Sequence, residues 1–224
     1  MKDVFSVIPE FFFDVIGIFI PGATLILALS WMDIRIEFSP LLQKYEGFVI
    51  LLICYLAGHI LYGLSTFIIA NLINWFGHKP KENWFNLNHN VKGVSKEVRE
   101  ELISEIRECS GEKGEISKNK KYYYEFCRNY LNKYAPERAG FVRKQQAYGE
   151  LSRSMIVIAL ICFVISLSPV VSGEKSVIMI PLAVFSIIFF GWRYIQARSI
   201  DALFIYTNFL VLRKSEKLNT QITK

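Results

Sequence analysis

Histidine and cysteine are scarce in this sequence, and their scarcity excludes several kinds of site. Three histidines and four cysteines occur among the 224 residues, without a C-x-x-C pair or a Cys/His cluster, so we expect no bound metal. Sequence signatures of serine hydrolases, phosphate-binding loops and zinc proteases are also absent, which removes the usual routes to hydrolytic chemistry. We therefore expect no enzymatic activity and no cofactor.

Charged residues are nearly missing from long stretches toward both ends of the chain. A helix needs about 20 mostly apolar residues to cross a bilayer, and its backbone must bond internally because lipid offers no partners. Four segments meet this requirement, namely residues 11–31, 48–76, 154–171 and 176–194. The sequence therefore predicts an all-α, polytopic membrane protein with four transmembrane helices and a helical cytosolic domain between spans 2 and 3.

The distribution of lysine and arginine predicts the orientation of these spans. Residues 77–153 carry sixteen basic residues and the tail from Arg193 carries six, whereas the two short connections between spans carry two and one. Basic segments remain on the cytosolic side of a membrane. We therefore expect residues 77–153 and both termini to be cytosolic.

Four parts of the chain follow from these assignments. The first two spans occupy residues 1–76, a basic cytosolic helical domain with a stalk occupies 77–153, spans 3 and 4 occupy 154–195, and a C-terminal helix and tail occupy 196–224.

The cytosolic part is expected to contain three helices. Ser95 is placed to cap a helix that runs to about Cys109, and residues 121–134 form a second helix with one aromatic face. Pro136 suits the first turn of a third helix, which we expect to continue to about residue 167 as a stalk and third span. A break at Gly149 is the alternative, because glycine weakens helices.

Two charged residues lie just inside the predicted spans. Asp14 and Arg193 are at similar depths near the cytosolic side. Because charges inside a membrane usually pair or line a cavity, we expect them to meet, within one subunit or between two. The alternative is that Arg193 reaches lipid phosphates and Asp14 lies among headgroups.

His59 lies near the middle of the second span, where it has a structural and a functional interpretation. Pro21 leaves the carbonyl of Gly17 without its usual donor, and His59 is a candidate donor to it. Otherwise His59 lines a pore or senses protons. The residues that we assign to gating, kinking and helix packing inside the spans are Asp14, His59, Asn71, Asn74 and Arg193, together with Pro21, Gly22, Gly58 and Gly63.

Basic and aromatic residues gather in the cytosolic part. Such mixtures suit an anionic membrane surface or a nucleotide, and a solvated charge run is the third interpretation. We also expect Arg143, Lys144 and Arg153, which lie close to the membrane, to be headgroup anchors or the basic residues that set the orientation of the spans. The candidates for binding a ligand or an anionic surface are Lys118, Lys120, Lys121, Tyr122, Tyr124, Arg143 and Lys144.

Three stretches, residues 14–22, 55–63 and 193–198, resemble small bacterial four-span membrane proteins of anti-phage defence systems, such as the membrane subunits of Kiwa and Hailong. The resemblance covers the spans, about half of the chain. It implies a homo-oligomeric effector of the bacterial inner membrane, a gated channel or a membrane-perturbing protein that stays closed until infection.

Two functions are therefore weighed from the sequence. In the first, the cytosolic domain binds a protein or a nucleotide-type ligand and gates the spans, with nucleic acid as a less favoured partner. In the second, the protein is a membrane anchor or scaffold that recruits a cytosolic partner and transports nothing. Both place the chain in a lipid bilayer.

Overall fold

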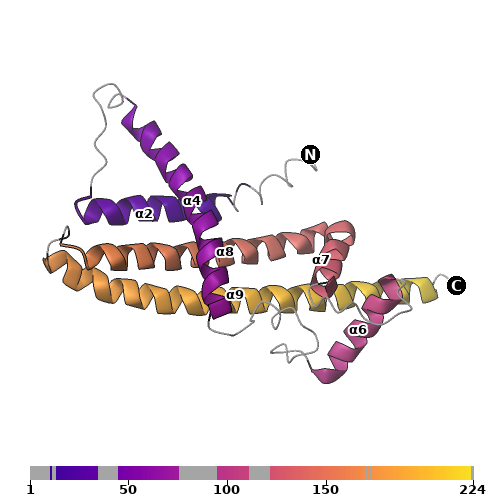
Figure 1. The fold of residues 1–224 in the computed structure, drawn as a ribbon. Helices are drawn as coiled ribbons and strands as arrows, with labels where there is room; N and C mark the ends of the chain where they lie inside the picture. The colour runs from indigo at the N-terminus through magenta and orange to yellow at the C-terminus, as the bar shows by residue number, and fades with distance from the viewer. Residues whose placement is uncertain are drawn as a thin grey trace. The chain divides into compact units, whose positions relative to one another are not determined.

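The described part of the chain is helical throughout its regular elements (Figure 1). The computed structural model describes residues 11, 14–34, 45–75, 95–110, 122–169, 171 and 173–222. The all-α class predicted from the sequence is confirmed for these residues. The helices are η1 (Val15–Phe19), α2 (Ile20–Trp31), α4 (Glu46–Trp75), α6 (Lys96–Ser110), α7 (Tyr122–Tyr134), α8 (Pro136–Ser166) and α9 (Gly173–Ile222).

Three of these helices are long and apolar enough to cross a membrane. They comprise Glu46–Ile69 of α4, the whole of α8, and Gly173–Gln221 of α9. The first predicted span corresponds to a shorter apolar stretch, Val15–Trp31, which is made of η1 and α2.

Local sequence accounts for where several helices begin. Ser95 caps α6, because its hydroxyl oxygen accepts a hydrogen bond from the Val98 N–H at 3.3 Å. Pro136 is the first residue of α8, and no break occurs at Gly149, so the continuous helix is confirmed over the alternative. Pro21 follows a π-helical turn in which the Ile20 N–H bonds the Val15 carbonyl. A wider turn of this kind accommodates a residue that lacks an N–H.

The chain divides into two compact units. Unit 1 contains Met1–Trp75 and Ala147–Gln196, and unit 2 contains Phe76–Gln146 and Ala197–Lys224. Helices α8 and α9 each contribute residues to both units.

Unit 1 has its own hydrophobic core. In Figure 1, α2 runs alongside α8, whereas α4 crosses α2 and α8 obliquely. Helix α8 is the most enclosed, since 61% of its most apolar stretch is buried, against 17% for α4 and 11% for α9. The core residues are Met32, Leu61, Val157, Ile158, Cys162, Val171 and Met179.

Unit 2 has a second core in which four helices meet. Its apolar residues come from α6, α7, the first part of α8 and the last part of α9. The apolar residues after position 196 therefore belong to a helical extension that packs on the cytosolic helices predicted from the sequence. The core residues are Leu102, Ile106, Tyr123, Tyr124, Cys127, Leu131, Val142, Ala202, Ile205, Tyr206, Phe209 and Leu210.

Two glycines allow α4 to approach the first apolar helix at backbone distance. A Cβ atom on Gly22 would lie 1.8 Å from the carbonyl oxygen of Cys54, and one on Gly58 would lie 2.1 Å from that of Ile18. Side chains cannot occupy such spaces, so only glycine permits this crossing. A Cβ atom on Gly63, in contrast, would meet nothing within 4 Å.

Alanine at position 58 should destabilise unit 1. The added methyl group would push α4 away from the first helix, and such overpacking costs about 1–3 kcal/mol. The melting temperature of the purified protein in detergent should therefore fall by several degrees. Gly191→Ala is the matched control, because its Cβ atom meets nothing within 4 Å, and an equal loss in both variants would contradict the crossing.

Candidate functional site

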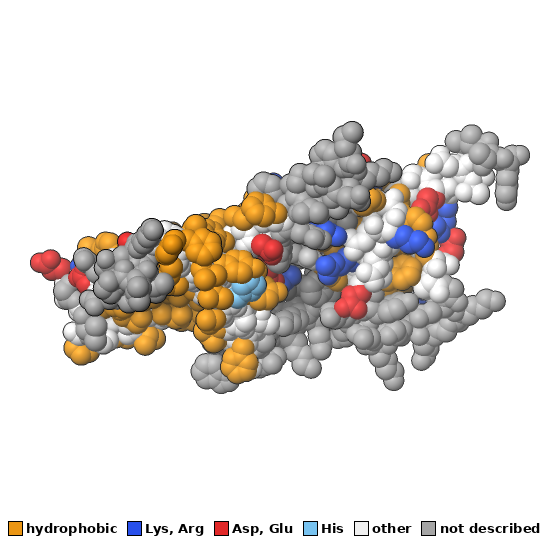
Figure 2. Space-filling model, turned by 90° about the horizontal axis from the view of Figure 1, so that it is seen from above, with side chains coloured by type: hydrophobic (Ala, Val, Ile, Leu, Met, Phe, Trp, Pro, Cys, Tyr) orange, Lys and Arg blue, Asp and Glu red, His pale blue; other side chains and the backbone are white. Residues whose placement is uncertain are grey.

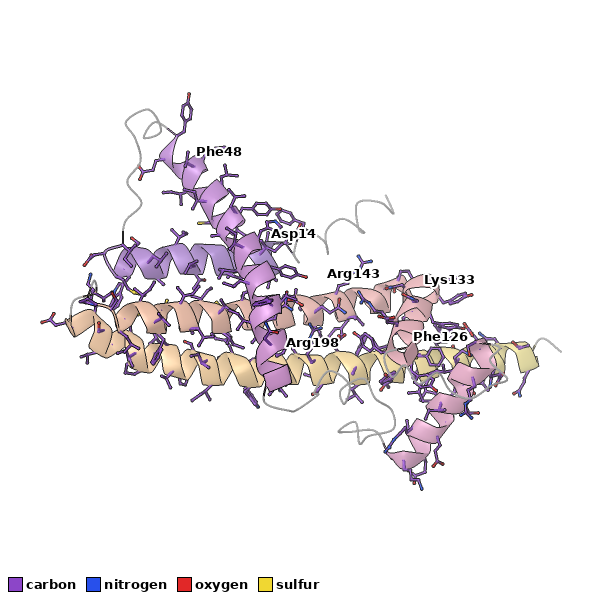
Figure 3. The ribbon with its side chains drawn as sticks, in the orientation of Figure 1. Asp14, Phe48, Phe126, Lys133, Arg143 and Arg198 are labelled. Carbon is purple, nitrogen blue, oxygen red and sulfur yellow. The ribbon has the colours of Figure 1, made fainter. Side chains whose placement is uncertain are left out.

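Asp14 and Arg193 do not meet within the described part of one chain. Asp14 is exposed at the start of η1 (Figure 3). Arg193 is also exposed, and its guanidinium donates to the Gln196 Oε1 at 2.7 Å. The version of the prediction in which the two charges pair between subunits stays a prediction.

His59 faces away from the first apolar helix. Its ring is exposed and packs edge-on against Tyr55, with ring centroids 4.5 Å apart. No hydrogen bond joins His59 to the Gly17 carbonyl in the part of the chain that the structure describes. The residue that meets η1 is the neighbouring Gly58, and the π-helical turn takes up the effect of Pro21.

Three hydroxyl groups of α2 and α4 are bonded within their own helices, whereas those of Ser154 and Ser166 on α8 are buried without a hydrogen-bond partner among the described residues. Thr24 donates to the Ile20 carbonyl, and Ser65 and Thr66 both donate to the Tyr62 carbonyl. These hydroxyls therefore do not require a water-filled path. Asn71 is exposed on α4, whereas the side chain of Asn74 lies outside the described residues.

Arg153 is buried in unit 1. It is 7% exposed, forms an ion pair with Glu150 one turn earlier on α8, and lies 5.1 Å from the centre of the Tyr62 ring. The expectation that Arg153 anchors the chain to headgroups is therefore wrong. Burial is tolerated because the carboxylate and the aromatic face replace water around the cation.

Unit 2 contains a buried polar network that links α7, α8 and α9. The Tyr124 hydroxyl donates to the Asp201 Oδ2 at 2.7 Å, and the Gln146 amide lies 3.5 Å from the same hydroxyl. Arg128 in turn donates to Gln146 at 3.4 Å. Tyr124 is 5% exposed and Asp201 is 1% exposed, so Tyr124 belongs to the core and is not free to bind a ligand or a lipid surface.

Burial shifts the acid–base properties of this network. It raises the pKa of Asp201, against the opposing effect of the Tyr124 hydrogen bond. Burial and the adjacent carboxyl group also raise the pKa of Tyr124. Tyr124 therefore remains protonated at neutral pH and acts as the donor. The second oxygen of Asp201 has no hydrogen-bond partner among the described residues, which identifies Asp201 as a costly group in this core.

Opposite charges join α6 to the end of α9. Glu105 lies at the centre, 2.6 Å from the Lys217 Nζ and 3.6 Å from the Arg213 Nε, and its side chain is 13% exposed. The Lys217 ammonium donates hydrogen bonds to Glu105 and Glu108, and these bonds raise the pKa of Lys217. The bond to Glu108 also lowers the pKa of that carboxyl group. We call this set the α6–α9 ladder, and its members are Glu101, Glu105, Glu108, Arg213, Lys214 and Lys217.

A pocket of about 420 Å³ opens on the surface of unit 2. Figure 3 labels Phe126 and Lys133 of α7, which are two of its lining residues. Its walls also include Cys109, Tyr130 and Tyr134, and the Lys133 ammonium lies 4.9 Å from the centre of the Tyr134 ring. Burial and a hydrogen bond to Glu216 raise the pKa of Tyr130 to about 12. The pocket therefore offers aromatic walls with one cation, Lys133, and one acidic residue, Glu125.

The remaining binding candidates are only partly described. Lys118, Lys120 and Lys121 lie outside the described residues, as does the side chain of Tyr122. Arg143 is half-buried and Lys144 is exposed on α8, and both make interactions of their own.

Comparison with known proteins gives no relative for the chain. No protein-family model, no curated protein and no solved structure matches it.

Asp201, Arg153 and the α6–α9 ladder are the main features that sequence reasoning missed. One signal was present for Asp201, since it is the single acid in an apolar stretch that resumes after the fourth predicted span. The ladder had no such signal, because α6 and α9 lie about a hundred residues apart in the sequence.

The Tyr124–Asp201 hydrogen bond should stabilise unit 2. Tyr124→Phe removes the donor to a buried carboxyl group, which costs about 1–3 kcal/mol. The loss should be smaller in an Asp201→Asn background, where no buried carboxylate is left unpaired. Thermal unfolding of the four proteins of this double-mutant cycle gives the coupling, and additive losses would contradict the contact.

The same acid should make stability depend on pH. The raised pKa means that Asp201 holds its proton more tightly in the folded protein than in the unfolded chain. Its contribution to the free energy of unfolding therefore falls as the pH rises above the ordinary pKa of an aspartate. Asp201→Asn should therefore become more stable relative to the wild type as the pH rises above about 4, the ordinary pKa of an aspartate. A stability difference that is flat with pH would refute this.

Glu105→Lys should loosen α6. The change places a third cation between Arg213 and Lys217, so hydrogen exchange in α6 should accelerate at least about tenfold. Glu100→Lys is the control, because Glu100 is 68% exposed and pairs with Lys96 of its own helix. Similar exchange rates in both variants would argue against the ladder.

Proposed function

We propose that this protein is a four-pass, homo-oligomeric effector of the bacterial inner membrane that acts in phage defence. In this proposal unit 1 lies in the bilayer as a gated channel or a membrane-perturbing assembly, and unit 2 is the cytosolic domain that controls it. The observation that carries the proposal is that α8 and α9 run unbroken through both units.

The surface of unit 1 supports its place in a bilayer. Large apolar side chains are exposed along α4 and the first half of α9, including Phe48 at 71%, Ile60 at 69% and Ile188 at 67%. Such a surface is unfavourable in water and suits lipid. The proposed spans are the four predicted from the sequence.

One ion pair supports the proposed orientation of the spans. Asp33, just after α2, pairs with Lys175 in the first turn of α9, and Lys175 also lies 5.8 Å from the Trp31 ring. The end of α2 and the start of α9 therefore lie together in unit 1. This agrees with a topology in which the basic domain and both termini are on the opposite, cytosolic side.

Shared helices provide a route for control. In unit 2, α8 and α9 contribute Val142 and Ile205 to one core, and in unit 1 they contribute Val157 and Met179 to the other. A change in how α6 or α7 packs would shift or rotate α8 and α9, because packed helices move as rigid bodies. The trigger in this proposal is a cytosolic protein or a nucleotide-type ligand, for which the aromatic pocket at Lys133 is the candidate site.

A conducting path would lie between copies of the chain. The hydroxyls of Thr24, Ser65 and Thr66 are occupied within their own helices, and those of Ser154 and Ser166 are buried inside unit 1, so the exposed surface of a single unit 1 offers few groups to coordinate an ion. A closed state that excludes water through an apolar constriction is consistent with such a lining.

The same observation favours a second candidate, a membrane anchor or scaffold. Inert spans are sufficient for a protein that recruits a cytosolic partner and transports nothing.

Liposome leakage by the purified full-length protein separates the two candidates. The effector should release a trapped dye, and releasing α6 with Glu105→Lys should change the leakage rate several-fold, whereas the Glu100→Lys control should not. Leakage that never exceeds that of protein-free liposomes, from a folded oligomer with or without an extract of infected cells, would reject the effector and leave the scaffold.

A further inference from the structure

Helix α4 presents two faces with different chemistry. The buried face carries Cys54, Gly58, Leu61, Ser65 and Ile69, which recur at three- and four-residue spacing and pack inside unit 1. These residues account for how α4 is held in its own chain.

A second, exposed face carries polar and small residues. We define the polar stripe of α4 as Tyr55, His59, Gly63 and Thr66, which also follow helical spacing. The next side chains around the helix, Leu56, Ile60 and Phe67, are purely apolar and 52–69% exposed. From Tyr55 to Phe67 the exposed surface of α4 is therefore divided between a polar stripe and an apolar one, whereas Leu52 and Phe48, which precede Tyr55 on the same line, are apolar and 48% and 71% exposed.

His59 cannot be left in hydrocarbon without a large cost. It lies about midway along the candidate span Glu46–Ile69, and its ring nitrogens have no hydrogen-bond partner in the part of the chain that the structure describes. A polar group without a partner at that depth costs several kcal/mol. Figure 2 shows a histidine side chain at a surface that is otherwise largely hydrophobic.

The remaining members of the stripe suit contact with another helix. A Cβ atom on Gly63 would meet nothing within 4 Å, so the backbone of α4 is open to close approach there. Small residues beside polar ones are typical of helix–helix contacts in membranes. Gly22 and Gly58 make such a contact within the chain, whereas the space at Gly63 is unfilled.

We infer that the polar stripe of α4 is the surface through which two copies of this chain associate in the membrane. A neutral imidazole carries one donor and one acceptor, so the His59 ring of one copy can donate a single hydrogen bond to that of the other, with a local departure from exact two-fold symmetry at the two rings. A two-fold interface places identical residues opposite one another, and Gly63 then allows the two α4 helices to approach. The inference rests on the proposed function, in which the protein is a homo-oligomer of membrane-spanning chains.

Disulfide cross-linking in native membranes tests this surface. Thr66→Cys lies on the polar stripe and Phe67→Cys lies at the same depth on the apolar side, with the side chain at position 67 being 67% exposed. The four native cysteines are kept, and the unaltered full-length chain gives the background. Thr66→Cys should form cross-linked dimers well above this background, and Phe67→Cys should not.

Substitution of His59 tests its role within the same surface. His59→Leu should weaken self-association in nanodiscs roughly three- to twenty-fold, as expected for the loss of one interhelical hydrogen bond. His59→Asn keeps a donor and an acceptor and should restore most of the association. Equal association of the Leu and Asn variants would overturn the part assigned to His59.

The outcomes distinguish this inference from the proposed function. Oligomers that persist while Thr66→Cys cross-links no better than Phe67→Cys would overturn the polar stripe and leave the oligomeric effector standing. A folded monomer by mass in nanodiscs would overturn both. Cross-linked dimers that never cause leakage would reject the effector and support the stripe.

Discussion

The rest of this structure depends on two long helices, α8 and α9, each of which packs in two different hydrophobic cores along its length. Helices α8 and α9 carry apolar residues for unit 1 and switch to an amphipathic pattern in unit 2, without ending in between. A helix of this kind is held by both cores at once, because residues from each end pack in a different hydrophobic cluster. In the proposed function, this continuity is the route by which repacking in one core would affect the other.

Two charged features of unit 2 limit how firmly α6 and α9 are held there. Asp201 is buried in α9 with one oxygen bonded to Tyr124 and the other unpaired, so it adds specificity at a cost in stability. The neighbouring helix α6 is held by two fully buried residues, Leu102 and Ile106, and by the α6–α9 ladder. Contacts of the ladder are partly exposed to water and weaken with salt. In the proposed function, control through unit 2 would therefore require the least free energy at α6.

Sequence reasoning located the helices well because their signals are local. The cap at Ser95, the start at Pro136 and the continuous run to about residue 167 all follow from nearest neighbours. It placed Arg153 at the surface and Tyr124 in a binding surface, whereas both are buried. Arg153 is buried with its partner Glu150, and Tyr124 is buried with its partner Asp201. The contact between Tyr124 and Asp201 spans 77 positions of sequence. Periodicity cannot show such a contact, and it also could not say that Gly58 and not His59 faces the first helix.

The most direct test of the account is hydrogen exchange along α8 in lipid nanodiscs. The account predicts slow exchange without interruption from Arg143 through Gln146 and Ala147 to Met155, since one helix serves both units there. A segment of fast exchange centred on Gly149 would mean that the helix is broken between the two cores. In that case α9 alone would run through both units, and the proposed control of unit 1 through α8 would lose its physical basis.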